Sequence, residues 1–223
     1  MDVNFMQEQL PLYVEAAKLT LHMAVWGILF SILTGLICSM IRYLKIPILR
    51  QLVACYIELS RNTPLLIQLF FLYFGLPKLG IVFSSESCAV IGLTFLGGSY
   101  MAEAFRSGLD NVSGIQIEAG LSLGMRKSQV FRKIILPQAV SNSIPVFCAN
   151  VIFLIKETSV FSAVALADLM FVTKDLIGIY YKTDEALFML VMAYLIILLP
   201  ISVLCTLIER RIRYAEYGAG STV

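Results

Sequence analysis

The chain has 223 residues, 59% of them hydrophobic, a mean hydropathy of +0.84 and a formal net charge of +2. Soluble domains are typically about 45–50% apolar, so this composition excludes an ordinary soluble protein and predicts an integral membrane protein in a lipid bilayer. The small net charge gives no indication of nucleic-acid binding, and the single histidine, His22, excludes a histidine-rich metal site, so we expect no metal.

Five apolar segments follow one another along the chain, and each is close to the roughly 20 residues that a membrane-spanning helix needs. The first and the last contain no charged residue. The sequence therefore predicts an all-α integral membrane fold with five transmembrane helices in a single domain over residues 1–223. The expected spans are about residues 19–41, 52–76, 87–105, 143–166 and 186–208, and a polar cytoplasmic loop covers residues 106–138.

Charged residues interrupt the three middle spans. A charged side chain at the centre of a bilayer costs about 2.5–3.5 kcal/mol on insertion scales, so it needs a polar partner or an aqueous path. Glu58 and Arg61 are three residues apart on one helix face and can form an ion pair, or act in a gate or pathway. Lys156 and Glu157 lie near mid-depth, where they either face a pathway or second subunit, or pair structurally, for example with Glu103.

Positive charges are unevenly distributed over the connecting segments, and cytoplasmic loops are the ones enriched in Lys and Arg. This bias predicts an N-terminus outside and a C-terminus in the cytoplasm, which requires an odd number of spans. The richer side holds Arg42, Lys45, Arg50, Arg106, Arg126, Lys127, Arg132, Lys133, Arg210, Arg211 and Arg213, and the other side holds Lys18, Lys78, Lys174 and Lys182.

The cytoplasmic loop 106–138 is patterned as two short helices. Ser113, followed three residues later by a glutamine, predicts a helix start, and Gly124 predicts a left-handed stop. A second helix is expected at about Lys127–Ile135, basic on one side and apolar on the other, with its end at Pro137. Together the two helices predict a compact projection on the cytoplasmic face.

The loop also carries a motif that resembles the EAA loop of ABC importer permeases. It consists of Glu118-Ala119-Gly120, then Gly124, then Phe131-x-x-Ile134-x-Leu136-Pro137, with Gly120 at a position where alanine is commoner. In that family the loop couples the permease to a groove in the ATPase subunit. Glu118 also suits the first turn of a helix through its interaction with the helix dipole. The resemblance implies ATPase-coupling roles for Glu118, Ala119, Gly120, Gly124, Phe131, Leu136 and Pro137.

Three further stretches, residues 58–68, 98–108 and 155–159, resemble the polar amino acid branch of these permeases. The order and spacing of the motifs fit over nearly the whole chain, which implies a type I ABC importer-like permease. Glu157 stands where relatives often have aspartate. The resemblance implies a chain in the prokaryotic cytoplasmic (inner) membrane that translocates polar amino acids.

A zwitterionic amino acid requires partners of both signs, so Glu103, Lys156 and Glu157 are a candidate lining for the pathway. Asn150 is seven residues before Glu157 and lies on the same helix face. Tyr100 fits an interfacial anchor or a core position better than a stacking surface, and Pro64 permits a kink in the second span. The candidate pathway residues are Arg61, Tyr100, Glu103, Asn150, Lys156 and Glu157.

The chain contains no G-x-x-x-x-G-K-[ST] phosphate loop and no Gly-Lys pair. We therefore expect a non-catalytic subunit without a cofactor of its own, with ATP and Mg²⁺ bound by a partner ATPase. The resemblance implies a complex with two ATPase subunits, an extracytoplasmic amino-acid-binding protein and a second permease copy or paralogue.

The alternative is a secondary transporter or channel subunit driven by an ion gradient. Glu103, Lys156 and Glu157 would then serve ion coupling. The sequence shows no internal repeat, which is common in such transporters, and an ion-driven mechanism leaves the cytoplasmic loop unexplained.

Overall fold

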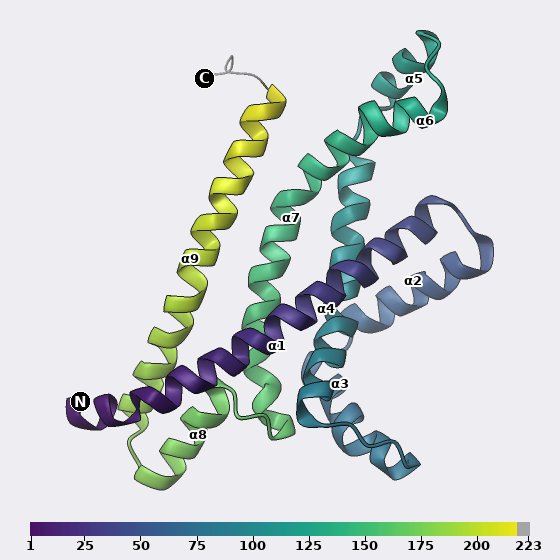
Figure 1. Cartoon of the computed structure of the whole chain (residues 1–223). Helices are drawn as coiled ribbons and strands as arrows, with labels where there is room; N and C mark the ends of the chain where they lie inside the picture. Colours follow the sequence, from purple (N-terminus) through teal and green to yellow (C-terminus); the bar gives the residue numbers. More distant parts are fainter. Residues whose placement is uncertain (218–223) are drawn as a thin grey trace.

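The computed structural model describes residues 1–217, with side chains as far as residue 212, so the side chain of Arg213 lies outside the described residues (Figure 1). Every regular element in this part of the chain is helical, which confirms the all-α fold class. The helices are α1 (Val3–Tyr43), α2 (Pro47–Arg61), α3 (Leu65–Phe70), α4 (Ser85–Asp110), α5 (Gly114–Ser122), α6 (Lys127–Val130), α7 (Leu136–Glu157), α8 (Leu169–Tyr180) and α9 (Thr183–Tyr217).

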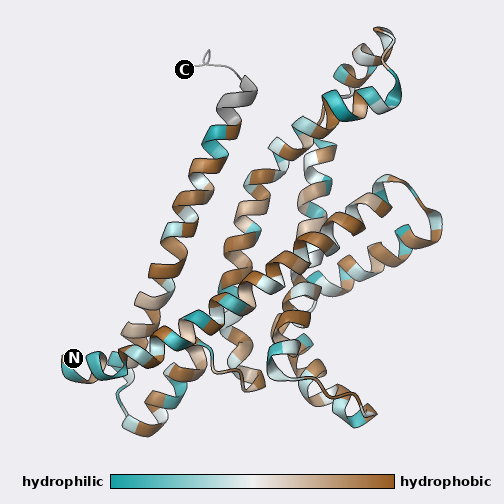
Figure 2. Cartoon of the chain, viewed as in Figure 1, coloured by the Kyte–Doolittle hydropathy of each residue, from teal (hydrophilic) through white to brown (hydrophobic). Residues whose placement is uncertain are grey.

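Within residues 1–217, four helical segments are long and apolar enough to cross a membrane. Hydrophobic residues dominate α9 and the middle of α7, whereas hydrophilic residues gather near α6 and at the N-terminus (Figure 2). The expected span 52–76 is not one continuous helix, because the chain breaks between α2 and α3. The four segments are Val3–Tyr43, Ser85–Asp110, Lys127–Val164 and Thr183–Ile212.

Pro64 accounts for the break in the second expected span. Proline has no N–H to donate and disfavours helical backbone in the residue before it. The side-chain amide of Gln68 donates to the carbonyls of Ser60 and Thr63, each at 3.1 Å. The protein thereby satisfies carbonyls that the break leaves without helical partners, as irregular backbone at membrane depth requires.

Helix α1 is much longer than the expected first span. Its 41 residues extend roughly 60 Å at 1.5 Å per residue, about twice the hydrocarbon thickness of a bilayer. Residues 19–41 are only its second half. In the first half, Phe5, Tyr13 and Ala16 are buried against α8 and α9, so this half is part of the folded core.

The prediction that the second loop helix ends at Pro137 is wrong. Helical structure continues from Lys127 to Val164. Directly before the proline, Phe131–Ile135 forms a wider π turn in which the N–H of Leu136 donates to the carbonyl of Phe131. A proline ring crowds the carbonyl four residues earlier, so the wider turn allows the helix to pass through.

Helix α4 packs along α1, and the two helices run in the same direction. Gly27 of α1 lies against Leu93 of α4, and Gly35 lies against Met101, so contacts advance together along both helices. The hydroxyl of Ser31, between the two glycines, donates to the carbonyl of Leu93 at 3.2 Å. Small residues and an interhelical hydrogen bond are typical of close helix packing in membranes.

Helix α4 also packs against α7, which runs in the reverse direction. Gly97 lies against both Ser31 of α1 and Leu154 of α7, and Gly108 lies against Ala139 and Ser143 near the start of α7. A Cβ at position 108 would meet the backbone carbonyl of Ala139. Because backbone cannot rotate away as a side chain can, this crossing depends on glycine.

Asp168 begins α8, in the connection that follows Val164. One carboxylate oxygen accepts the N–H of Phe171 at 2.8 Å, and the other is buried without a hydrogen-bond partner in the described part of the chain. Burial raises the pKa of Asp168 to about 7, although the backbone N–H of Phe171 opposes that shift. Folding therefore stabilises the protonated form of Asp168 relative to the unfolded chain.

The variant Gly108→Ala is expected to lower the free energy of unfolding by about 1–3 kcal/mol, the usual cost of overpacking. The matched control is Gly114→Ala on α5, where an added Cβ has no neighbour within 4 Å. Alanine has the higher helix propensity, so the control should be as stable as the parent or slightly more stable. Thermal unfolding of the detergent-purified chain measures both, and equal stabilities of the two variants would contradict the packing described.

The variant Asp168→Asn is expected to remove a pH-dependent contribution to stability. The pKa of this carboxyl is higher in the folded protein than in the unfolded chain, so stability from this site falls as pH rises from about 4 through about 7. Asparagine caps a helix as well as aspartate does, so the cap is retained. Unfolding experiments should show that the stability of the variant relative to the parent rises between about pH 5 and about pH 8. A stability difference that does not change with pH would count against a buried, protonated Asp168.

Candidate coupling surface and transport pathway

The turn after α5 is fixed by Gly124. Its backbone has φ of +80°, in the left-handed region, as the sequence predicts. The N–H of Met125 donates to the carbonyl of Gly120, and the N–H of Gly124 donates to that of Leu121, which is the Schellman pattern of a helix end. Ser113 occupies the N-cap position of α5, but its side chain makes no capping hydrogen bond.

Gly120 holds α5 against the next helical segment. It is buried, and a Cβ there would lie 2.7 Å from the side-chain end of Ile134 and 3.3 Å from that of Val130. This contact gives a physical reason for glycine at a motif position where alanine is commoner. The two segments therefore form one compact projection, which Figure 1 shows extending beyond the other helices.

The outer surface of the projection combines apolar and acidic side chains. Ile115 is 78% exposed and Leu123 is 84% exposed, while Glu118 and Ala119 are exposed between them. Large apolar side chains that protrude together are typical of a surface that binds another protein. The other predicted coupling residues lie elsewhere: Gly120 is buried, Phe131 is partly buried 5.5 Å from the ring of Tyr43, and Leu136 and Pro137 are exposed where α7 begins.

Glu103 is bound in an ion-pair cluster between α1 and α4. Its carboxylate lies 2.6 Å from Arg42 and 2.7 Å from Arg106, and Arg106 also contacts Asp110 at 3.1 Å. The expected grouping of Glu103 with Lys156 and Glu157 is not formed. Because α4 and α7 run in opposite directions, Glu103 and Glu157 lie toward opposite ends of the helix pair.

Three of the predicted pathway residues do come together, from α2, α4 and α7. The guanidinium carbon of Arg61 lies 5.3 Å from the ring centroid of Tyr100. The amide of Asn150 donates to the carbonyl of Tyr100 at 3.1 Å, and the Tyr100 ring is 5.0 Å from that of Phe153. The expected Glu58–Arg61 ion pair is not formed, since Glu58 accepts a hydrogen bond from the side chain of Asn62 instead.

Hydrogen bonds to α4 hold Arg61 beside Tyr100. The hydroxyls of Tyr56 and Ser60 both donate to the carbonyl of Phe95, at 2.7 and 2.8 Å, and Ser60 also donates to Ser99 at 3.0 Å. These bonds fix the end of α2 on α4, directly before the break in the chain. Because Arg61 is the last residue of α2, these hydrogen bonds also fix its position.

Lys156 and Glu157 lie at the C-terminal end of α7, where a tighter helix, Thr158–Val164, begins. Lys156 is exposed and Glu157 is partly buried. Glu157 follows Phe153 by four residues, so the two side chains share a face of the helix about one turn apart. This face continues from Asn150, so one side of α7 presents an amide, an aromatic ring and a carboxylate in succession.

Two contributors were not among the predicted site residues. Phe153 was detectable in principle, because it lies three residues after Asn150 and four before Glu157, at helical spacing. Arg42, which pairs with Glu103, is separated from it by 61 residues. No local sequence pattern reports a contact of that kind.

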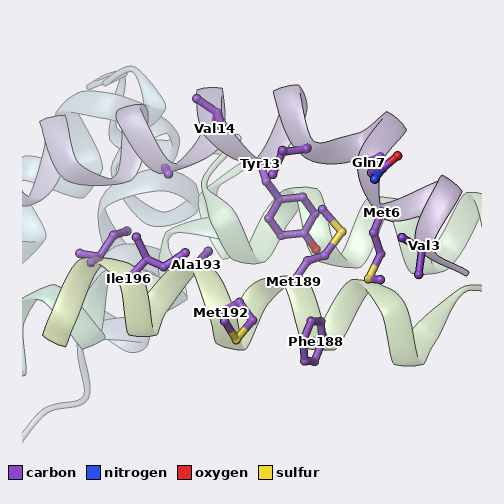
Figure 3. A pocket seen from close by; sticks show the side chains of 13 residues that line it. Val3, Met6, Gln7, Tyr13, Val14, Phe188, Met189, Met192, Ala193 and Ile196 are labelled. Carbon is purple, nitrogen blue, oxygen red and sulfur yellow. The ribbon is translucent and has the colours of Figure 1, made fainter. Parts of the chain in front are cut away.

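An apolar groove of about 410 Å³ lies between the first half of α1 and α9. Figure 3 shows Met6, Tyr13, Met189 and Met192 along its walls. The hydroxyl of Tyr13 is already bound, donating to the carbonyl of Ala186 at 2.8 Å. No charged side chain lines the groove, so it does not suit a zwitterionic solute.

Several known proteins are similar to this chain over most of its length. The probable amino-acid permease protein YxeN of Bacillus subtilis (strain 168) is 38% identical over 212 residues, covering 94% of this chain and 95% of the relative. The probable amino-acid ABC transporter permease protein PatM of Vibrio harveyi is 41% identical over 172 residues, covering 76% of this chain and 77% of the relative. A solved structure described as an amino acid ABC transporter with histidines matches with a TM-score of 0.90 at 30% identity, covering 95% of this chain and 99% of that one.

Residues 27–214 match the family described as binding-protein-dependent transport system inner membrane component. This range includes the helix break at Pro64, the projection around α5 and the face of α7 that carries Asn150. The chain therefore belongs to the family of binding-protein-dependent transport system inner membrane components, as a permease subunit of an ABC importer.

Proposed function

We propose that this permease translocates polar amino acids, delivered by an extracytoplasmic binding protein, using ATP hydrolysed by a partner subunit. The main support is the likeness in fold and sequence to an amino acid ABC transporter over 95% of this chain. Relatives that cover most of the chain also carry amino-acid permease names. The chain itself provides binding surfaces and changes conformation, and the partner ATPase binds ATP and Mg²⁺.

We further propose five membrane crossings, with the N-terminus outside and the C-terminus in the cytoplasm. Because α1 and α4 pack in the same direction, the chain between them has to return across the membrane. The broken segment formed by α2 and α3 makes that return. The excess of Lys and Arg on the side of the α5 projection supports the same orientation.

In this proposal, α5 enters a groove of the ATPase subunit through Ile115, Glu118 and Leu123. Gly120 packing ties α5 to the helical path Lys127–Val164, which also carries the pathway face of α7. A displacement at the ATPase therefore reaches the pathway through one hydrogen-bonded helix. No flexible linker intervenes along this route.

The proposed pathway offers charges of both signs to a zwitterion. Arg61 faces the solute carboxylate, Glu157 faces its ammonium group, and Tyr100 with Phe153 forms the wall between them. Because Arg61 is exposed in a single chain, a second permease copy or paralogue is proposed to close the pathway. Two permeases would then engage two ATPase subunits. The ion-gradient alternative is not retained, since the chain belongs to a family of binding-protein-dependent transport components.

The variant Leu123→Ala should weaken the interaction with the ATPase subunit by about 1–2 kcal/mol, because it removes a protruding apolar contact. Its matched control is Leu79→Ala, a leucine that is 74% exposed far from the projection, after α3. The amount of ATPase that co-purifies with the permease measures the effect, with chain stability checked in parallel. Equal recovery of ATPase with both variants would exclude Leu123 from the interface.

The variants Arg61→Gln and Glu157→Gln should each reduce amino-acid uptake about tenfold, since each removes a charged hydrogen-bonding partner of the solute. Complex assembly should be unchanged. Uptake into vesicles containing the whole complex measures this, with Arg210→Gln as a control that removes an exposed arginine from the end of α9. If both variants transport at the parental rate and with parental substrate choice, these side chains are structural only.

A further inference from the structure

We propose that the permease holds one anionic phospholipid between the ends of α1 and α4 and the start of α7. Two adjoining cavities carry this inference. One is polar, with a volume of about 310 Å³, and the other is apolar, with a volume of about 620 Å³. They share Ser39, Tyr43 and Leu109 as walls, so a polar compartment opens directly onto an apolar one.

The polar compartment is strongly cationic. Arg42, Lys45, Arg50 and Arg106 line it, with Asp110 as the acidic member. Arg42 pairs with Glu103, and Arg106 pairs with Glu103 and Asp110.

Lys45 and Arg50 form no ion pair with any residue in the described part of the chain. Lys45 has φ of +54°, and its backbone N–H donates to the carbonyl of Arg42 at 3.3 Å, so a left-handed turn places it beside the cluster. The compartment therefore offers two exposed cations, Lys45 and Arg50, in addition to a neutralised ion-pair network. This excess of positive charge suits a phosphate group.

The apolar compartment suits an acyl chain. Its walls include Leu36, Met40, Phe105, Phe131 and Val140, which come from the membrane-spanning part of α1, from α4 and from the path that leads into α7. A free phosphate or another soluble anion would leave this groove uncovered. Only an amphiphile with a negative head group and an apolar tail matches both compartments.

The chemistry commits the site to an anionic phospholipid such as phosphatidylglycerol, and excludes a zwitterionic one as the preferred occupant. The proposed orientation places it in the cytoplasmic leaflet, where anionic head groups attract basic clusters near the membrane surface. The site goes beyond the proposed transport function and requires no contact with the transported solute.

Native mass spectrometry of the intact, detergent-purified complex, titrated with phosphatidylglycerol, tests the proposal. The parent protein should retain one lipid per permease chain, and Lys45→Gln/Arg50→Gln should bind it about tenfold or more weakly. Arg210→Gln/Arg211→Gln removes the same charge from the end of α9 and should bind as the parent does. Equal losses in the two double variants would show a general charge effect and overturn the proposal.

The apolar compartment is tested separately with Val140→Trp, which fills the groove without changing any charge. Val140 is 52% exposed, and the control Val203→Trp adds the same ring at a position of α9 that is 56% exposed. Only Val140→Trp should displace the lipid. Parental binding by Val140→Trp, equal binding of phosphatidylcholine, or displacement by excess inorganic phosphate would each overturn the proposal.

Discussion

The close packing of α4 between α1 and α7 is the constraint on which the rest of the structure depends. Gly35 lets α1 approach α4 until it lies against Met101, and Gly108 lets α4 approach the backbone of Ala139 in α7. The parallel register with α1 and the antiparallel register with α7 follow from these contacts. The broken α2–α3 segment is fixed on the same helix, through the carbonyl of Phe95.

This packing explains how residues distant in sequence meet in one wall of the proposed pathway. Tyr100 lies on α4, receives Asn150 from α7 and stacks under Arg61 at the end of α2. The α5 projection is joined to the same wall, because the helix that begins at Lys127 continues through Pro137. A permease that moves solute in response to an ATPase needs such a direct mechanical connection.

The sequence allowed the local features to be predicted, because they depend on neighbouring residues. Gly124 was expected in a left-handed turn and has φ of +80°. Apolar run length predicted five spans, and four of them correspond to long apolar helices in the described part of the chain. It predicted only the second half of α1, because Glu8, Glu15 and Lys18 interrupt the first half. Pro64 was expected to bend a span and breaks it, because Gln68 stabilises the open ends.

Long-range contacts could not be predicted from one sequence. Glu103 could be paired with Lys156 on charge alone, whereas the register of α4 with α1 gives it Arg42. Arg61 could equally be paired with Glu58, three residues away, but the end of α2 directs it over Tyr100. The continuation through Pro137 depends on a π turn, which has no simple sequence signature.

We expect the α5 projection and the proposed pathway face of α7 to move as one body. Spin labels at Gln116 and Lys156, both exposed, in a complex whose native cysteines are replaced, would report the distance between them with and without a trapped ATP analogue. The distance should be the same in both states, because Gly120 and the continuous helix join the two sites. A change of about 5 Å or more, comparable to one helical turn, would show that the segment bends and that the two sites do not move as one body.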